Sequence, residues 1–197
     1  MSYGDSLVFF GYFGAGSPPE FMTGAGTERE RWYGVSWQPS AVFDGRPGPQ
    51  VQEPDSFYAV YRDMIDGARS RKTVLEMALD TALTRADPGQ VSIGVRIEPT
   101  DSVVDQMSHL SLMVVVFEDS VPYEYLGDTL HAWRVVRRVL SDTWGIPVSL
   151  RFGVPFETTL VASNPGWRPA HVGVAAFVQD RESKQVLQST ARLRLGE

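Results

Sequence analysis

The second half of the sequence is a series of short apolar segments with the spacing of β-strands. Val91, Ile93, Val95 and Ile97 alternate with other residues, as in a strand that buries one face. Similar apolar runs are residues 110–118, 151–162, 171–180 and 185–195. Strands at this spacing, with few helices between them, predict an antiparallel β-sandwich. We place it at residues 87–197.

Residues 125–140 differ from the strand-like runs around them. Bulky apolar residues alternate irregularly there with Arg134, Arg137 and Arg138. We interpret the segment as a helix or an irregular excursion. On a helix, two of these arginines would share one face.

The first half has a mixed pattern, so the fold class predicted for the whole chain is α+β. The expected elements are a buried strand at 6–13, a helix from Thr27 to Tyr33 ended by Gly34, a strand at 40–43 followed by an Asp44-Gly45 turn, a helix at 57–71 and more helix at 73–85. The Asp-Pro-Gly sequence at 87–89 then places the domain boundary near residues 86–90, between domains of residues 1–86 and 87–197.

Composition excludes several classes of protein. The chain has 197 residues, of which 43% are hydrophobic and 21% charged, which are ordinary values for a globular protein. The net charge of -6 argues against binding to nucleic acid. No apolar run approaches the roughly 20 residues of a transmembrane helix, so we expect no membrane span.

The 197 residues contain no cysteine. Disulfide scaffolds, iron–sulfur clusters and cysteine-based zinc sites are therefore not expected. Thiol–disulfide exchange needs a thiolate, so we expect no redox catalysis by these residues.

No pattern of polar residues predicts a catalytic, cofactor or metal site. His109, His131 and His171 lie on three different segments and lack metal-site spacing. Glu118 and Asp119 are adjacent, so on a strand their side chains would point to opposite faces. The sequence also lacks the G-x-S-x-G motif of serine hydrolases.

Two parts of the sequence resemble known proteins. Residues 32–45 resemble part of a thioredoxin-type domain, in which Pro39 would occupy the place of the cis-proline. Five segments between residues 112 and 190, including Thr143-Trp-Gly-Ile-Pro and Val174-Ala-Ala-Phe-Val-Gln-Asp, resemble a family of bacterial cell-envelope proteins. That family includes outer-membrane lipoproteins and joins a thioredoxin-like domain to a C-terminal β-sandwich. The combined similarity covers residues 30–195.

The resemblance implies a partial thioredoxin-like domain at 1–86, without its cysteine-bearing strand and helix, followed by an immunoglobulin-like sandwich. It also implies a periplasmic or membrane-peripheral location. Where members carry a His-Asn-His-like stretch, this sequence has Ala132-Trp133-Arg134 beside His131. The function we expect is non-enzymatic: an accessory or structural subunit that binds a protein partner such as a membrane complex, or a second copy of itself.

We place the expected interface on the aromatic front region and the basic cluster, because aromatic residues and Arg are enriched in binding hot spots. Exposed aromatic rings of a truncated domain would form a patch that needs a partner. The residues are Phe10, Tyr12, Phe13, Trp32, Trp37, Pro39, Arg134, Arg137 and Arg138.

Two alternatives remain open from the sequence. One is a thiol–disulfide oxidoreductase whose Cys-x-x-Cys segment lies upstream of Met1. The other is a glycan- or ligand-binding sandwich, in which Trp133, Trp144 or Trp167 would stack on the ligand.

Overall fold

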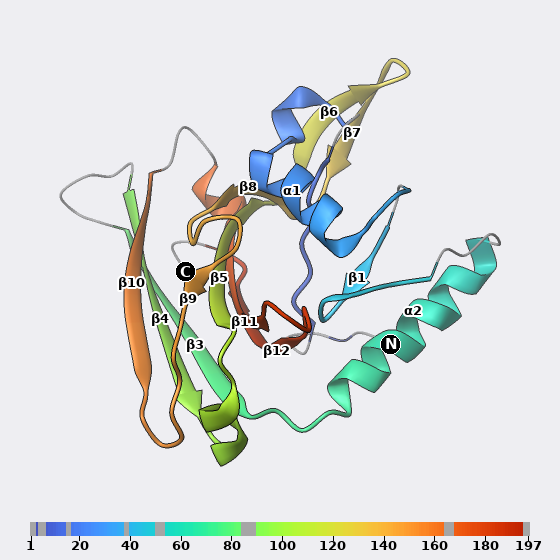
Figure 1. Cartoon of the computed structure of the whole chain (residues 1–197). Coiled ribbons are helices and arrows are strands. Elements are labelled where there is room, and N and C mark those ends of the chain that lie inside the picture. Colours follow the sequence, from blue (N-terminus) through green and yellow to red (C-terminus); the bar gives the residue numbers. More distant parts are fainter. Residues whose placement is uncertain are drawn as a thin grey trace.

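Two antiparallel β-sheets form the body of the protein (Figure 1). The computed structural model describes residues 3, 7–14, 17–37, 40–49, 54–83, 90–163 and 168–194. Strand predominates among them, and the predicted β-sandwich is confirmed at this level. Short 3₁₀ helices lie at Pro19–Phe21, Ser102–Gln106 and Pro169–His171.

The first sheet has three strands in the order β10-β4-β3. Their bounds are β3 at Leu75–Leu83, β4 at Gln90–Pro99 and β10 at Phe156–Ser163. The predicted alternation in β4 is confirmed, because Val91, Ile93, Val95 and Ile97 are buried and the residues between them are not.

The second sheet has the order β12-β11-β5-β8, with β9 paired to the start of β5. The bounds are β5 at Leu110–Glu118, β8 at Val135–Val139, β9 at Ile146–Pro147, β11 at Val172–Asp180 and β12 at Val186–Arg192. Alternate residues of β5 and β11 face β4 in the main core, among them Leu112, Val114 and Val174. Full burial of such a side chain contributes about 1.5–3 kcal/mol.

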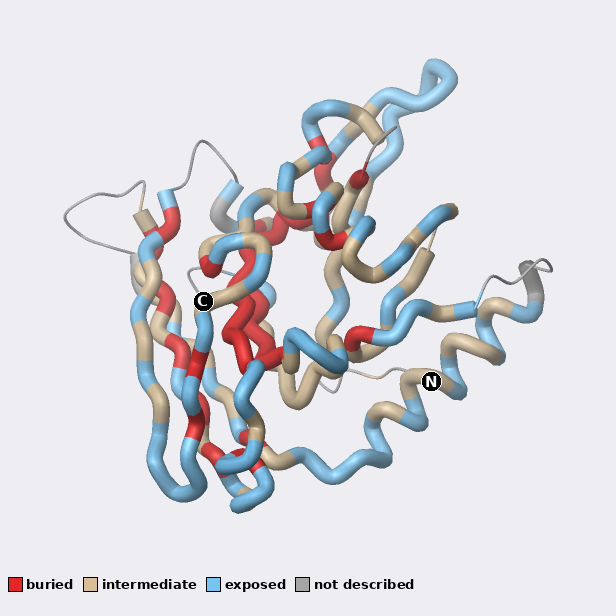
Figure 2. The backbone as a smooth tube through the Cα atoms, viewed as in Figure 1, coloured by how far each residue is buried: buried red, intermediate tan, exposed pale blue. Residues whose placement is uncertain are grey.

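A third layer covers the other face of the second sheet. All nine residues of β5 are buried, and the central strands carry most of the buried backbone in Figure 2. The residues that point away from the main core, such as Val115 and Phe117, pack with Phe10 and Tyr12. Residues 7–14 therefore lie on the sheet without forming the regular strand predicted for 6–13, and bridge to other residues singly at Gly11 and Phe13.

The predicted first helix and tight turn are confirmed. Helix α1 spans Gly24–Tyr33 and ends at Gly34, which has φ 72°. It begins a turn earlier than predicted, because Thr23 and not Thr27 caps it by accepting a hydrogen bond from the Gly26 amide at 3.0 Å. Strands β1 (Val42–Phe43) and β2 (Arg46–Pro47) flank the Asp44-Gly45 turn.

Helix α2 spans Pro54–Arg69, close to the prediction, and stands to one side of the sandwich (Figure 1). Its apolar side includes Phe57 and Tyr61, whose rings are 5.3 Å apart. Tyr61 also contacts Phe43 at 5.0 Å, which attaches the helix to the β1–β2 hairpin.

The helix predicted at 73–85 is wrong, and the segment 125–140, expected to be a helix or an irregular excursion, forms strands. Residues 75–83 form β3, because Leu75, Met77 and Leu79 alternate toward the core and the strand pairs with β4 over nine residues. This strand of the sandwich precedes the boundary placed near residues 86–90. Residues 125–140 are not helical either: they contain the end of one hairpin strand, a second hairpin strand and β8.

The described front region contains no sheet of the thioredoxin type. Between residues 17 and 49 its described strands are β1 and β2, each two residues long. Residues 7–14 and α1 pack on the sandwich instead of on a sheet of their own. Gln38 and Pro39, on which the predicted cis-proline depends, lie outside the described residues.

Candidate interaction surface

A two-stranded hairpin projects from the end of the sandwich (Figure 1). Its strands are β6 (Val121–Tyr125) and β7 (Asp128–Ala132), paired from Val121 opposite Ala132 to Tyr125 opposite Asp128. Leu126 and Gly127 form the turn, with φ values of 53° and 91°. Positive φ at both central residues is typical of a type I′ hairpin turn.

Most side chains on one face of this hairpin are apolar, and Asp128, opposite Tyr125 at the tip, is the charged residue on that face. At the base, Val121 is buried and clusters with Phe21, whose ring also lies edge-on to Tyr123 at 5.4 Å. Toward the tip the same kinds of side chain become exposed: Leu130 is 41% exposed, Tyr125 57% and Leu126 88%. The base is therefore part of the fold, while the tip offers apolar side chains to another molecule.

Leu126 combines this exposure with an unfavourable backbone conformation. A left-handed φ is uncommon for a bulky residue and is mostly left to Gly, Asn or Asp. No described intramolecular contact of the Leu126 side chain compensates for it, since the side chain is 88% exposed. Backbone strain of this kind concentrates at ligand-binding and switch regions.

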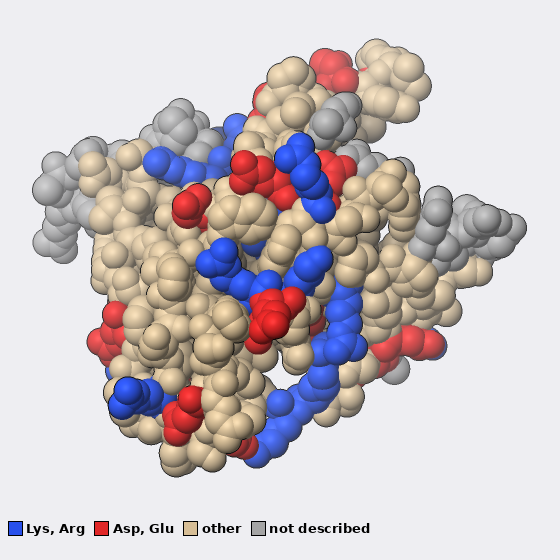
Figure 3. Space-filling view, viewed as in Figure 1, with Lys and Arg blue, Asp and Glu red and all other residues tan. Residues whose placement is uncertain are grey.

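The charges beside the tip are acidic. Asp128 is exposed opposite Tyr125, and Glu124 is exposed on the other face of the hairpin. The Thr129 hydroxyl donates a hydrogen bond to Glu124 at 2.7 Å. In Figure 3 the tip, at the top of the view, is uncharged surface with acidic side chains next to it. A complementary surface would present an apolar pocket with basic residues at its rim.

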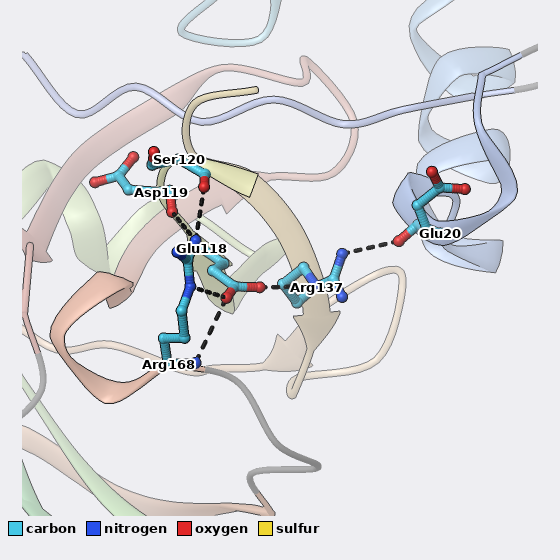
Figure 4. Close-up of polar contacts among 6 residues, drawn as sticks. All are labelled: Glu20, Glu118, Asp119, Ser120, Arg137 and Arg168. Atoms are coloured by element: carbon cyan, nitrogen blue, oxygen red, sulfur yellow. Dashed lines mark hydrogen bonds and ion pairs between the residues drawn. The ribbon is translucent and has the colours of Figure 1, made fainter. Parts of the chain in front are cut away.

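A buried carboxylate anchors the hairpin base (Figure 4). Glu118, at the end of β5, lies 3.5 Å from Arg137 Nε and 3.7 Å from Arg168 Nε. Arg168 also donates to the Ser120 carbonyl at 2.6 Å, and Arg137 to the Glu20 carbonyl at 2.8 Å. These contacts join β5, β8 and the start of the hairpin, so the direction in which the hairpin projects is held by the fold.

Asp119 completes this anchor. Its carboxylate accepts a hydrogen bond from the Arg134 amide at 2.9 Å, and its own amide donates to the His171 carbonyl at 2.8 Å. Both acidic residues of the Glu118-Asp119 pair are thus engaged within the chain. Their described contacts are structural, with guanidinium and backbone groups.

A second cluster of buried polar groups surrounds Arg29, which is 2% exposed. Its guanidinium donates to the Tyr33 hydroxyl at 2.6 Å, the Gln179 side-chain oxygen at 2.8 Å and the Thr143 carbonyl at 3.2 Å. It also lies within 6 Å of four aromatic ring centroids. No ion pair with a carboxylate is present for Arg29 among the described residues, so these dipoles and π faces compensate its charge.

Tyr12 lies against this cluster and its hydroxyl is buried without a hydrogen-bond partner among the described residues. Burial raises the pKa of Tyr12 to about 12. Because the folded-state pKa is above the ordinary value near 10, the resulting stability is complete below pH 10 and is lost as the pH rises through 12. Tyr12→Phe is expected to change stability at pH 7 by less than about 1 kcal/mol, since no hydrogen bond is lost.

The measurement is urea unfolding of wild type and Tyr12→Phe between pH 8 and pH 12. We expect Tyr12→Phe to reduce the decline in stability above pH 10 by about 2–3 kcal/mol. Parallel pH profiles for the two proteins would contradict this assignment.

The aromatic residues predicted to bind a partner have neighbours within the chain. Phe10 stacks on Phe177 at 5.9 Å and meets Tyr12 at 5.7 Å. Phe13 contacts Phe21 at 4.9 Å. All three predicted residues are half-buried, so packing onto the second sheet accounts for much of their apolar surface.

The tryptophans are distributed over different environments. Trp32 packs edge-on against Trp144 at 5.6 Å, and its carbonyl accepts a hydrogen bond from Lys184. Trp37 is half-buried, whereas Trp133 is 63% exposed just beyond the hairpin. Pro39 and Trp167 lie outside the described residues.

The predicted basic cluster is not on a helix. Arg137 and Arg138 are neighbours on strand β8, where the register against β5 shifts and leaves Arg137 without an opposite residue, while Arg134 precedes the strand with φ 50°. Arg134 donates to the Phe9 carbonyl and Arg137 pairs with Glu118. Arg138 is the exposed member of the three, so the described contacts leave it for an external charge.

The described residues contain no group of three His, Cys, Asp or Glu placed to hold a metal ion. His109 approaches Glu182 at 3.5 Å, and the backbone amide of His171 donates to the Arg168 carbonyl. None of the helices among the described residues is long and apolar enough to cross a membrane.

Sequence reasoning missed both the hairpin and Arg29. The hairpin has a local signal, since Leu126-Gly127 separates two five-residue segments and Gly favours the left-handed turn position. Among its hydrogen bonds, Arg29 has only the i, i+4 spacing to Tyr33 as a local signal, because its other hydrogen-bond partners are 84 to 150 residues away in sequence.

Comparison with known proteins identifies the fold. No protein-family model and no curated protein matches the sequence. Among solved structures, HBP35 of Porphyromonas gingivalis aligns with a TM-score of 0.68 and 15% identity over 84% of this chain and 55% of that chain. This chain therefore spans about half the length of HBP35. A domain of the outer membrane lipoprotein Omp28 from the same organism aligns with a TM-score of 0.43 and 13% identity, over 61% of this chain and 88% of that domain.

Proposed function

We propose that this protein is a non-enzymatic interaction protein of the bacterial cell envelope that docks onto a protein partner through the tip of the β6–β7 hairpin. The observation that carries the proposal is Leu126, an apolar side chain held 88% exposed in a left-handed conformation. The envelope location is supported by the sequence resemblance over residues 30–195, and the fold shared with a bacterial protein, HBP35, agrees with it.

The proposed interface therefore lies at the hairpin tip and not on the aromatic front region predicted from the sequence. Phe10, Tyr12 and Phe13 support the base of the hairpin and the face of the second sheet, while Tyr125, Leu126 and Leu130 supply the exposed apolar contact. Trp133, directly after the hairpin, and Arg138, on β8 opposite Val116, remain exposed and extend the proposed contact.

Binding is expected to depend strongly on the tip side chain. Leu126→Asp places a charge in the apolar contact and is expected to weaken partner binding at least about 30-fold, as for a hot-spot residue. Folding should be retained, because the residue contacts little of its own chain and Asp tolerates the left-handed region better than Leu. Glu182→Ala, in an exposed turn of another part of the fold, is the matched control.

The test is photocrosslinking in intact cells, with a photoreactive amino acid at position 126 or, as control, at position 182. A discrete adduct formed only from position 126, and affinity of the isolated partner for wild type and Glu182→Ala but not for Leu126→Asp, would support the proposal. Adducts formed equally from both positions, or none from position 126, would contradict it.

A further inference from the structure

Three of the four outer strand edges of the two sheets have other described parts of the chain beside them. Strand β12 lies near β3, and the Gln188 amide nitrogen donates to the Thr73 hydroxyl and the Leu75 carbonyl, both at 3.2 Å. At β8, the Gly11 amide donates to the Arg134 carbonyl at 2.8 Å and the Gly11 carbonyl accepts from the Val136 amide at 2.9 Å. The edges of β3 and β12 therefore lie near each other, and one end of β8 pairs with Gly11.

The outer edge of strand β10 differs from those of β3, β12 and β8. It pairs with β4 over eight residues, and no backbone hydrogen bond between described residues joins it to any other strand. An unpaired row of amides and carbonyls is a template for another strand unless charge, proline or a bulge protects it. Within Phe156–Ser163 there is no proline, the register to β4 has no shift, and the single charge, Glu157, pairs with Arg96.

The two faces of β10 match those of a second, antiparallel copy of itself. Phe156, Thr158, Leu160 and Ala162 face the core side, and the alternate residues, beginning with Glu157, are exposed. Pairing about a two-fold axis at Thr159 would place Thr158 opposite Leu160 on the inner face. It would place Glu157 opposite Val161 on the outer face, so the two carboxylates do not meet.

We propose that β10 is a self-association edge at which two copies of this chain pair antiparallel about Thr159. The two three-stranded sheets would then become one continuous sheet across the two-fold axis. The sheet edge lies at β10 and not at the β6–β7 hairpin, so this dimer leaves the hairpin tip free and does not depend on the function proposed above.

The test uses Thr159, because the two-fold axis would place this residue opposite Thr159 of the second copy. Lys at this exposed site sets two like charges side by side, and so does Glu. We expect wild type to sediment at twice the 21.9 kDa chain mass. Thr159→Lys and Thr159→Glu should each raise the dimer dissociation constant about fivefold or more. A mixture of the two variants should restore dimers that contain one copy of each. Thr100→Lys, at an exposed site away from the axis, should leave the dimer unchanged.

Analytical ultracentrifugation from 1 to roughly 100 µM protein, the range in which weak edge pairing is populated, gives the readout. A wild type that stays monomeric throughout would overturn the proposal. So would a dimer that both Thr159 variants leave intact, which would point to another surface. Loss of the dimer in Leu126→Asp would also overturn it, because the hairpin would then be the contact.

Discussion

Arg29→Ala is expected to lower the free energy of unfolding by about 3–5 kcal/mol. The substitution leaves the Gln179 side-chain oxygen and the Thr143 carbonyl without their guanidinium donor, and removes a large side chain from between α1 and the second sheet. It also removes the cation over the rings of Tyr12 and Phe177. Equilibrium urea unfolding measures the effect.

Arg31→Ala is the control for this prediction, since Arg31 is exposed on the same helix and its loss should cost less than about 0.5 kcal/mol. Hydrogen exchange should show α1 losing protection before β5, because Arg29 attaches the outer layer and the main core lies beyond it. Similar destabilisation by the two substitutions would show that the buried cluster is not what holds the layer in place.

Gly45→Ala is expected to have the second-largest effect, a loss of about 2–4 kcal/mol. Gly45 has φ 85°, and a methyl group there would overlap the Lys184 carbonyl. That carbonyl also accepts a hydrogen bond from the Gln179 side chain at 2.6 Å. The clash therefore disturbs the hydrogen bond from the Val186 amide to the Asp44 carbonyl and, through Gln179, the Arg29 cluster.

Gly127 provides a close comparison, because it has φ 91° but no atom within 4 Å of an added Cβ. Gly127→Ala should therefore cost only the backbone strain, about 1–2 kcal/mol, half or less of the Gly45→Ala loss. Chemical denaturation of both variants, with hydrogen exchange at residues 180–186, separates strain from clash. Equal losses would mean that the contact with Lys184 contributes little.

The hairpin tip and the β10 edge are proposed to make two different contacts, each with a different partner molecule. The tip is an apolar projection with acidic neighbours, suited to a pocket in another protein. The edge offers backbone groups in a register that suits its own copy. Because the two lie on different sheets and strands, Leu126 and Thr159 variants are expected to have separate effects.

The long strands β4, β5, β10, β11 and β12 were predictable from the sequence because their signal is local. The alternation of Val91 to Ile97 and the apolar run at 110–118 define strands by the period of two that any half-buried strand must have. The Asp44-Gly45 turn follows likewise from the φ angles that a two-residue turn requires. Where two local patterns compete, as at residues 73–85, the sequence prediction of helix was wrong because pairing with β4 overrode helix propensity.

The candidate surfaces depend on tertiary structure instead. Whether Phe10 or Tyr12 is an exposed anchor or part of a core depends on Phe177, more than 150 positions away in sequence. Whether Leu126 is buried depends on how Glu118 and its two arginines direct the hairpin. The sequence alone therefore determined that the chain forms a β-sandwich, because strand formation follows from neighbouring residues. Only the three-dimensional structure decided which apolar side chains and which strand edge remain exposed, because exposure depends on contacts between residues far apart in the chain.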